Sequence, residues 1–136
     1  MCFIIQAEVI GTKAADRKAF EAPVPGTQRQ VEWYLSDTKG KPLQLGVKGN
    51  CTCILVAGGR AAENPTIWPL RSEWVPRIVR AVEWLYDQSP KGIVVWAIFF
   101  GDAPRNERAC SIDELLTLLE GHEIANRTRY VVRKRR

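Results

Sequence analysis

The stretch IVVWAIFF, residues 93–100, decides the fold. Its apolar residues follow one another without the alternation that marks a strand with one face in water. A short continuous run of this kind is typical of a strand that is covered on both faces. The sequence SPKG precedes it, and the polar stretch GDAPRNERAC follows it as a predicted loop. We therefore place residues 93–100 at the centre of a sheet.

A helix is predicted before this strand. The segment EWVPRIVRAVEWLYDQ, residues 73–88, spaces its apolar residues as one face of an α-helix does. Pro76 is tolerated only in the first turn, so the helix should begin near Trp74. The apolar stripe consists of Val75, Ile78, Val79, Val82, Leu85 and Tyr86.

A second helix is predicted after the strand. Ser111 and Glu114 have the spacing of a capping box, in which each side chain accepts from the backbone N–H of the other residue. The box opens IDELLTLLE, residues 112–120, and Gly121 suits the position that ends a helix.

The remaining strands are predicted from short runs rich in β-branched and aromatic residues. Residues 29–57 form a three-stranded antiparallel meander in this interpretation, with a hairpin turn at Gly49-Asn50. The predicted strands are CFIIQAEVI (2–10), RQVEWYL (29–35), LQLGV (43–47), CTCILVA (51–57) and RTRYVVR (127–133).

Together these elements predict an α+β protein of one domain. We expect a mixed five- to six-stranded sheet, an antiparallel meander followed by two β-α-β units, with two main helices packed mainly on one face. The domain should span residues 1–132, followed by a basic tail at 133–136. If strands 51–57 and 93–100 are parallel, the loops 58–71 and 101–110 leave the same edge, where open α/β sheets tend to bind ligands.

The charge of the chain is concentrated at its end. Twenty Lys and Arg residues against fifteen Asp and Glu residues give a net charge of +5. The last four residues carry four of these charges, which leaves +1 (5 minus 4) for residues 1–132. Phosphate binding by such a tail is the alternative function, nucleic-acid binding, although no known nucleic-acid-binding motif is present. The residues concerned are Arg133, Lys134, Arg135 and Arg136.

The cysteines indicate neither a metal site nor a catalytic site. Cys51 and Cys53 should point to the same face of a strand as small buried residues, and the single histidine, His122, is far away in sequence. No nucleophile motif or phosphate loop is present, so we expect no enzyme, cofactor or metal. The N-terminal stretch lacks the basic region of a secretory leader, and no stretch is long enough to span a membrane. We expect a small soluble, cytoplasmic protein with reduced thiols.

The predicted function is non-enzymatic protein binding or self-association, including the possibility of a toxin-neutralising immunity protein. The two long loops and nearby aromatic residues would form the interface, since aromatic and Arg side chains dominate such surfaces. The competing interpretation is that the tryptophans fill the core and the loops are only solvated. A small-molecule site at the 58–71/101–110 edge is a further alternative. The candidate residues are the anchors Trp68 and Trp33, with Arg60, Asn64, Asp102 and Arg105 around them.

Overall fold

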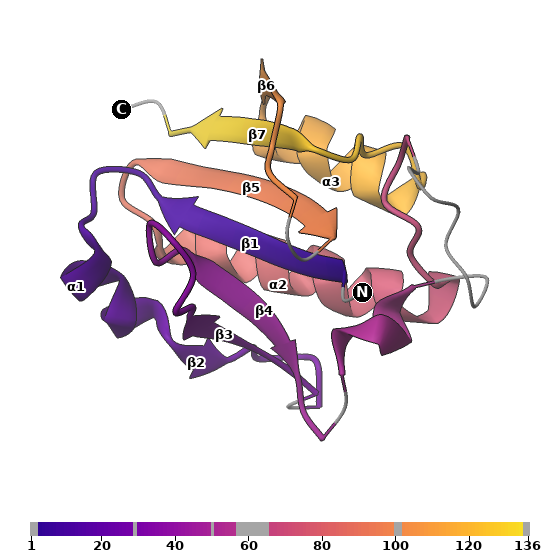
Figure 1. Cartoon of the computed structure of the whole chain (residues 1–136), viewed down its shortest axis with the longest axis horizontal. Helices are drawn as coiled ribbons and strands as arrows, with labels where there is room; N and C mark the ends of the chain where they lie inside the picture. Colours follow the sequence, from indigo (N-terminus) through magenta and orange to yellow (C-terminus); the bar gives the residue numbers. More distant parts are fainter. Residues whose placement is uncertain (1–2, 29, 50, 57–65, 100–101, 135–136) are drawn as a thin grey trace.

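A computed structural model of the chain describes residues 3–28, 30–49, 51–56, 66–99 and 102–134 (Figure 1). Within them lie seven strands: β1 Phe3–Val9, β2 Ala22–Pro23, β3 Val31–Leu35, β4 Leu43–Val47, β5 Gly92–Phe99, β6 Asn106–Ala109 and β7 Thr128–Arg133. The helices there are α1 Ala14–Arg17, α2 Val75–Gln88 and α3 Ile112–Glu120, with 3₁₀ turns η1 Lys18–Phe20, η2 Thr52–Leu55 and η3 Ser72–Trp74. No helix in these ranges is long and apolar enough to cross a membrane.

The strands form one mixed sheet in the order β2-β3-β4-β1-β5-β7-β6. All neighbours are antiparallel except β6 and β7, which run parallel. The predicted α+β class with a single mixed sheet is confirmed, although the sheet has seven strands rather than five or six. Strand β5 pairs with β1 on one side and with β7 on the other, as its continuous apolar sequence requires.

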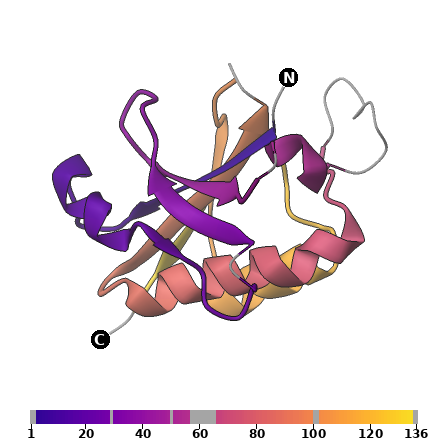
Figure 2. The same cartoon turned by 90° about the horizontal axis from the view of Figure 1, so that it is seen from below.

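The main core lies between the sheet and two helices. Helices α2 and α3 pack on the same face of the sheet (Figure 2), and their buried side chains belong to the main apolar cluster. On β1 this cluster takes Phe3, Ile5, Ala7 and Val9. Because side chains of a strand alternate between faces, the residues between them point the other way.

The outer face, which is the sheet face turned away from α2 and α3, has a smaller apolar cluster. Its members are Ile4, Val94, Trp96, Ile98 and Val131, each at most 8% exposed. Strand β5 therefore supplies buried side chains to both faces, which explains why its sequence shows no alternation.

Both predicted helices are confirmed in detail. Pro76 stands in the first turn of α2, whose N-cap is Trp74. At the start of α3 the Ser111 hydroxyl accepts from the Glu114 N–H at 3.1 Å, and the Glu114 carboxylate accepts from the Ser111 N–H at 3.3 Å. Gly121 caps the helix, but the left-handed φ of 54° falls on the next residue, His122.

The prediction of strand 51–57 is wrong. Residues 52–55 form the 3₁₀ turn η2, in which only Leu55 is buried while Cys51 and Cys53 are exposed. One apolar anchor suffices for a connecting turn but not for a strand within a sheet. The antiparallel meander consists of β2, β3 and β4, one strand earlier in the chain than predicted.

The predicted β-α-β units are also different. The first cannot form without a strand at 51–57, and in the second, β5 and β7 are antiparallel. The parallel unit is β6-α3-β7, in which the short strand β6 lies within the stretch predicted as a polar loop. Its sequence NERA has no apolar pattern, because all four residues are exposed.

Candidate functional site

The two tryptophans predicted as partner anchors are buried, so that prediction is wrong. Trp33 and Trp68 are each 1% exposed. The Trp33 Nε1–H donates to the backbone oxygen of Ala81 in α2 at 3.0 Å. The Trp68 ring packs against the Phe3 ring, with 6.1 Å between the ring centroids. Both side chains complete the main core, which is the competing interpretation of their sequence.

The two predicted binding loops approach one segment, residues 124–127. The N–H of Trp68 donates to the oxygen of Ile124 at 2.9 Å, and the N–H of Asn126 donates to the oxygen of Thr66 at 3.0 Å. The N–H of Arg105 donates to the oxygen of Arg127 at 2.7 Å. Two of the candidate residues, Arg60 and Asn64, lie outside the described residues.

Asp102, Arg105 and Arg127 form a charged cluster beside this segment. The Arg127 guanidinium pairs with one carboxylate oxygen of Asp102, and Arg105 approaches the other at 3.7 Å. Arg127 has a left-handed φ of 55°, and its backbone oxygen accepts from the N–H groups of both Arg105 and Asn106. The cluster therefore fixes the start of β6, and the Arg105 side chain remains 68% exposed.

The pKa of the Asp102 carboxyl lies below its usual range, because the N–H of Ala103 and the guanidinium of Arg127 both favour the charged form. A lowered folded-state pKa stabilises the fold above the ordinary carboxyl pKa, and this contribution is lost as the pH falls through the folded-state pKa. We expect Asp102→Asn to lower the free energy of unfolding at neutral pH by at most about 1 kcal/mol. The difference from the unmodified protein should shrink on acidification.

Urea unfolding measured from neutral to acidic pH checks this expectation. The control is Arg105→Gln, which keeps the Arg127–Asp102 pair and removes only the weakest of the causes that lower the Asp102 pKa, so it should keep most of the acid dependence. An Asp102→Asn variant whose stability loss stays constant down to acidic pH would contradict the assignment.

Strand β6 lies at the end of the sheet, and no other described strand pairs with its outer edge. It projects at one side of the sheet (Figure 1), and all four of its residues are exposed. The N–H of Asn106 donates to the oxygen of Arg127, just before β7, at 3.2 Å, and the N–H of Cys110, just after β6, donates to the oxygen of Val131 in β7 at 3.1 Å. Backbone groups alternate in direction along a strand, so the backbone N–H and C=O of Arg108 also face β7. Those of Glu107 and Ala109 face outward. At the opposite edge, β2 has two residues and one is Pro23, which lacks an N–H.

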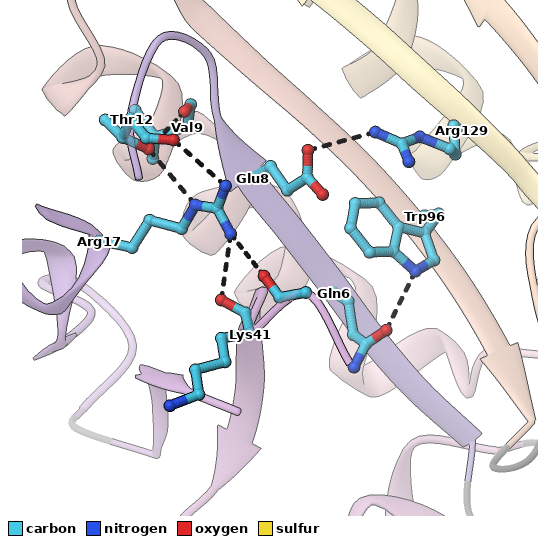
Figure 3. Close-up of polar contacts among 9 residues, drawn as sticks. Gln6, Glu8, Val9, Thr12, Arg17, Lys41, Trp96 and Arg129 are labelled. Atoms are coloured by element: carbon cyan, nitrogen blue, oxygen red, sulfur yellow. Dashed lines mark hydrogen bonds and ion pairs between the residues drawn. The ribbon is translucent and has the colours of Figure 1, made fainter. Parts of the chain in front are cut away.

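Side-chain amides link four strands across the outer face. The Trp96 Nε1–H donates to Gln6 Oε1 at 3.0 Å (Figure 3), the Gln6 amide donates to Gln44 Oε1 at 3.2 Å, and the Gln44 amide donates to the Tyr34 hydroxyl at 2.7 Å. These residues are neighbours in the sheet register. Each buried amide group thus has a protein partner, and the row is structural rather than a ligand site.

Arg129 continues this row towards β6. Its guanidinium lies 5.0 Å from the centroid of the Trp96 ring and donates to Glu8 at 3.2 Å (Figure 3). In the parallel register Glu107 of β6 stands beside Arg129. The residue of β7 that stands beside Glu107, Arg129, is therefore held in place by stacking on Trp96 and by an ion pair with Glu8.

Arg17 has a different, structural role. Its guanidinium donates to the backbone oxygens of Thr12, Gly40 and Lys41 at 3.2, 2.8 and 3.2 Å (Figure 3). These bonds join the turn after β1 to the turn between β3 and β4. The N–H groups that an arginine would offer to an anionic ligand are thus used within the fold.

A shallow surface depression flanks β6 on the helix side. It is lined by Arg108 of β6 and by Asp113, Glu114, Thr117 and Leu118 of α3. Its charged rim contains groups of both signs, so it does not select a ligand by charge alone.

Comparison of the chain with family models, curated proteins and solved structures found no match.

The predicted basic tail is partly built into the fold. Arg133 is the last residue of β7 and pairs with Gly92 of β5. The N–H of Lys134 donates to the oxygen of Lys91 at 3.0 Å, and its ammonium lies 4.7 Å from the Tyr86 ring centroid. The domain boundary predicted after residue 132 is thus two residues too early in the described chain. Arg135 and Arg136 lie outside the described residues.

Sequence reasoning found Asp102 and Arg105 but missed the strand beside them. Glu107 and Ala109 gave no signal, because an edge strand that is exposed on both faces needs no apolar alternation. The described residues contain no group of three or more His, Cys, Asp or Glu side chains placed to hold a metal ion.

Proposed function

We propose that the protein is a non-enzymatic protein-binding protein whose partner adds an extended segment to the β6 edge. One observation carries the proposal. The backbone N–H and C=O groups of Glu107 and Ala109 face outward, and no other described strand pairs with them. Strand addition to such an edge uses backbone hydrogen bonds for affinity and side chains for specificity. The edge strand is short and carries charged side chains, two features by which proteins limit unspecific pairing at exposed sheet edges.

The charge around the edge favours an acidic partner segment. Arg105 and Arg108 are exposed, whereas Asp102 is already paired with Arg127. Glu107 is the acidic residue of the strand, and it stands beside Arg129. The exposed guanidinium groups of Arg105 and Arg108 would attract acidic side chains of an incoming strand and speed its encounter with the protein.

The same charges disfavour a second copy of this chain at the edge. In an antiparallel pair of β6 strands, the outward-facing residues of one copy must lie opposite the outward-facing residues of the other. Because these residues, Glu107 and Ala109, have odd numbers, odd-numbered residues oppose odd-numbered ones and even-numbered residues oppose even-numbered ones. The two registers centred on the middle residues of the strand place Arg108 opposite Arg108 or Glu107 opposite Glu107, and registers centred on Asn106 or Ala109 pair fewer residues of the two strands. Like charges directly opposite each other destabilise a strand pair. A different protein is therefore the occupant that we propose.

Ala109→Pro is expected to abolish binding of an acidic strand. Proline removes the outward N–H of residue 109 without removing a bond to β7. The probes are short fluorescent peptides of β-branched residues with acidic, neutral or basic side chains, measured by fluorescence anisotropy. We expect the acidic peptide to bind the unmodified protein most tightly, and its affinity to fall at least about tenfold in Ala109→Pro, which corresponds to 1.4 kcal/mol.

The control is Ala109→Ser, which keeps the N–H and should keep the affinity. Melting temperatures of the three proteins separate loss of the edge from loss of the fold. Equal binding to Ala109→Pro and Ala109→Ser would exclude strand addition at β6, as would the absence of any binding of the peptides to the unmodified protein.

A further inference from the structure

Two thiols lie side by side on the surface. The Sγ atoms of Cys51 and Cys53 are 3.4 Å apart, and both residues are exposed. The sequence predicted them as buried residues of a strand, but the 3₁₀ turn η2 turns them outward instead. The site lies on neither β6 nor the outer face of the sheet, so it is independent of the proposed binding edge.

The turn that bears the thiols is anchored from one end. Leu55 is fully buried, and its oxygen accepts from the N–H of Arg71 at 2.7 Å. The Arg71 side chain donates to the oxygen of Val56 at 2.8 Å, and Val56 pairs with Leu70. These bonds fix the C-terminal end of η2 to the segment that leads into α2. The closeness of the two thiols is thus a property of an anchored turn.

We propose that Cys51 and Cys53 form a dithiol–disulfide couple that exchanges with low-molecular-weight disulfides such as oxidised glutathione. Two adjacent, exposed thiols have the access and the closeness that such exchange requires. A single exposed thiol would stop at the mixed disulfide, whereas its neighbour here is in position to resolve it.

The exchange balances in two steps. One thiol loses its proton to water, and the thiolate attacks a sulfur of the small disulfide, forming a mixed disulfide and releasing one thiolate. The second thiol then loses its proton and attacks the protein sulfur of the mixed disulfide, which releases the second thiolate. The two protons end on the released thiolates. The protein sulfurs give up two electrons in forming one S–S bond, and the small disulfide is reduced to two thiols.

The third described cysteine is a natural contrast. Cys110 is half-buried, and burial together with the nearby Glu114 carboxylate raises the pKa of its thiol. A raised pKa leaves less thiolate, which is the species that attacks disulfides. Exchange should therefore favour the Cys51–Cys53 pair over Cys110.

A metal ion is a weaker occupant of this pair. Structural zinc takes four protein ligands. Among the described residues, no group of three or more His, Cys, Asp or Glu side chains is placed to hold a metal ion. Two thiols are sufficient for disulfide exchange.

The test treats the full chain with oxidised glutathione and identifies the products by mass spectrometry of proteolytic peptides. We expect one species that has lost two hydrogen atoms and carries a Cys51–Cys53 link. An excess of reduced glutathione should restore the dithiol, since exposed disulfides are the readily reduced ones. Cys53→Ser should instead accumulate glutathione on Cys51, with the intramolecular link lost completely.

Cys110→Ser is the matched control and should give the same linked species as the unmodified protein. The unmodified chain is itself the main test, so a variant that fails to fold does not affect the result. Stable glutathione adducts without a Cys51–Cys53 link would overturn the proposal. A disulfide that joins either thiol to another cysteine instead would also overturn it.

Discussion

Gly92→Ala is expected to be among the most destabilising single substitutions in this protein. Gly92 opens β5 with a φ of 107°, a conformation that residues with a Cβ rarely adopt. A Cβ built there would lie 2.0 Å from the backbone oxygen of Val132 and 2.9 Å from the Cα of Arg133. Both contacts are with backbone atoms, so no side chain can move aside. We expect a loss of about 3–6 kcal/mol in the free energy of unfolding, from strain and overpacking together.

The matched control is Gly49→Ala. Gly49 also has a positive φ, of 72°, but a Cβ there would have no atom within 4 Å. This variant pays the backbone strain alone, about 1–2 kcal/mol. Urea unfolding of the two variants therefore separates the steric effect at the β5–β7 pair from the effect of φ. Equal losses would show that β7 does not approach β5 as closely as the structure has it.

The second large effect is expected for Trp68→Ala. Truncation of a fully buried aromatic side chain leaves a cavity and should lower the free energy of unfolding by about 3–5 kcal/mol. The sequence interpretation of Trp68 as a surface anchor predicts the opposite, namely an unchanged melting temperature. Thermal unfolding of this one variant therefore decides between a core residue and an interface residue.

Phenylalanine variants refine the same experiment. The Trp33 Nε1–H donates to Ala81 of α2, whereas the buried Trp68 Nε1–H has no hydrogen-bond partner among the described residues. Trp33→Phe should therefore cost about 1 kcal/mol more than Trp68→Phe, which is the usual net value of one hydrogen bond. A smaller loss for Trp33→Phe would contradict the bond to α2.

The elements that the sequence predicts well are those in which burial and local chemistry agree. Residues 93–100 had to be interior because a continuous apolar run has no face for water, and β5 pairs on both sides. Ser111 and Glu114 defined the start of α3 through their own hydrogen bonds, independently of the rest of the fold. Pro76 likewise restricted the start of α2 by its covalent structure.

The elements that were missed depend on distant partners. Residues 51–57 have the composition of a strand, but no described strand of the sheet pairs with residues 51–56, and η2 buries only Leu55. Conversely, β6 has no large apolar residue and is held by its backbone pairing with β7 and by the bond from the Asn106 N–H to the oxygen of Arg127. Aromatic side chains are ambiguous for a similar reason, because composition cannot tell whether Trp33 and Trp68 face a helix or the solvent. The exposure of Cys51 and Cys53 was missed for the same reason, because they belong to the turn at η2 and not to a buried strand.

The pairing of β1 with β5 has a consequence for the order in which the chain can fold. Phe3 pairs with Phe99 and Val9 with Ile93, so β1 is synthesised well before its partner strand β5. Contacts between such distant residues slow folding, because loop closure must precede them. During synthesis the β3–β4 hairpin can form early, while the apolar face of β1 lacks its main partner. We therefore expect nascent chains that stop before residue 92 to be the most prone to aggregate and to depend on a chaperone.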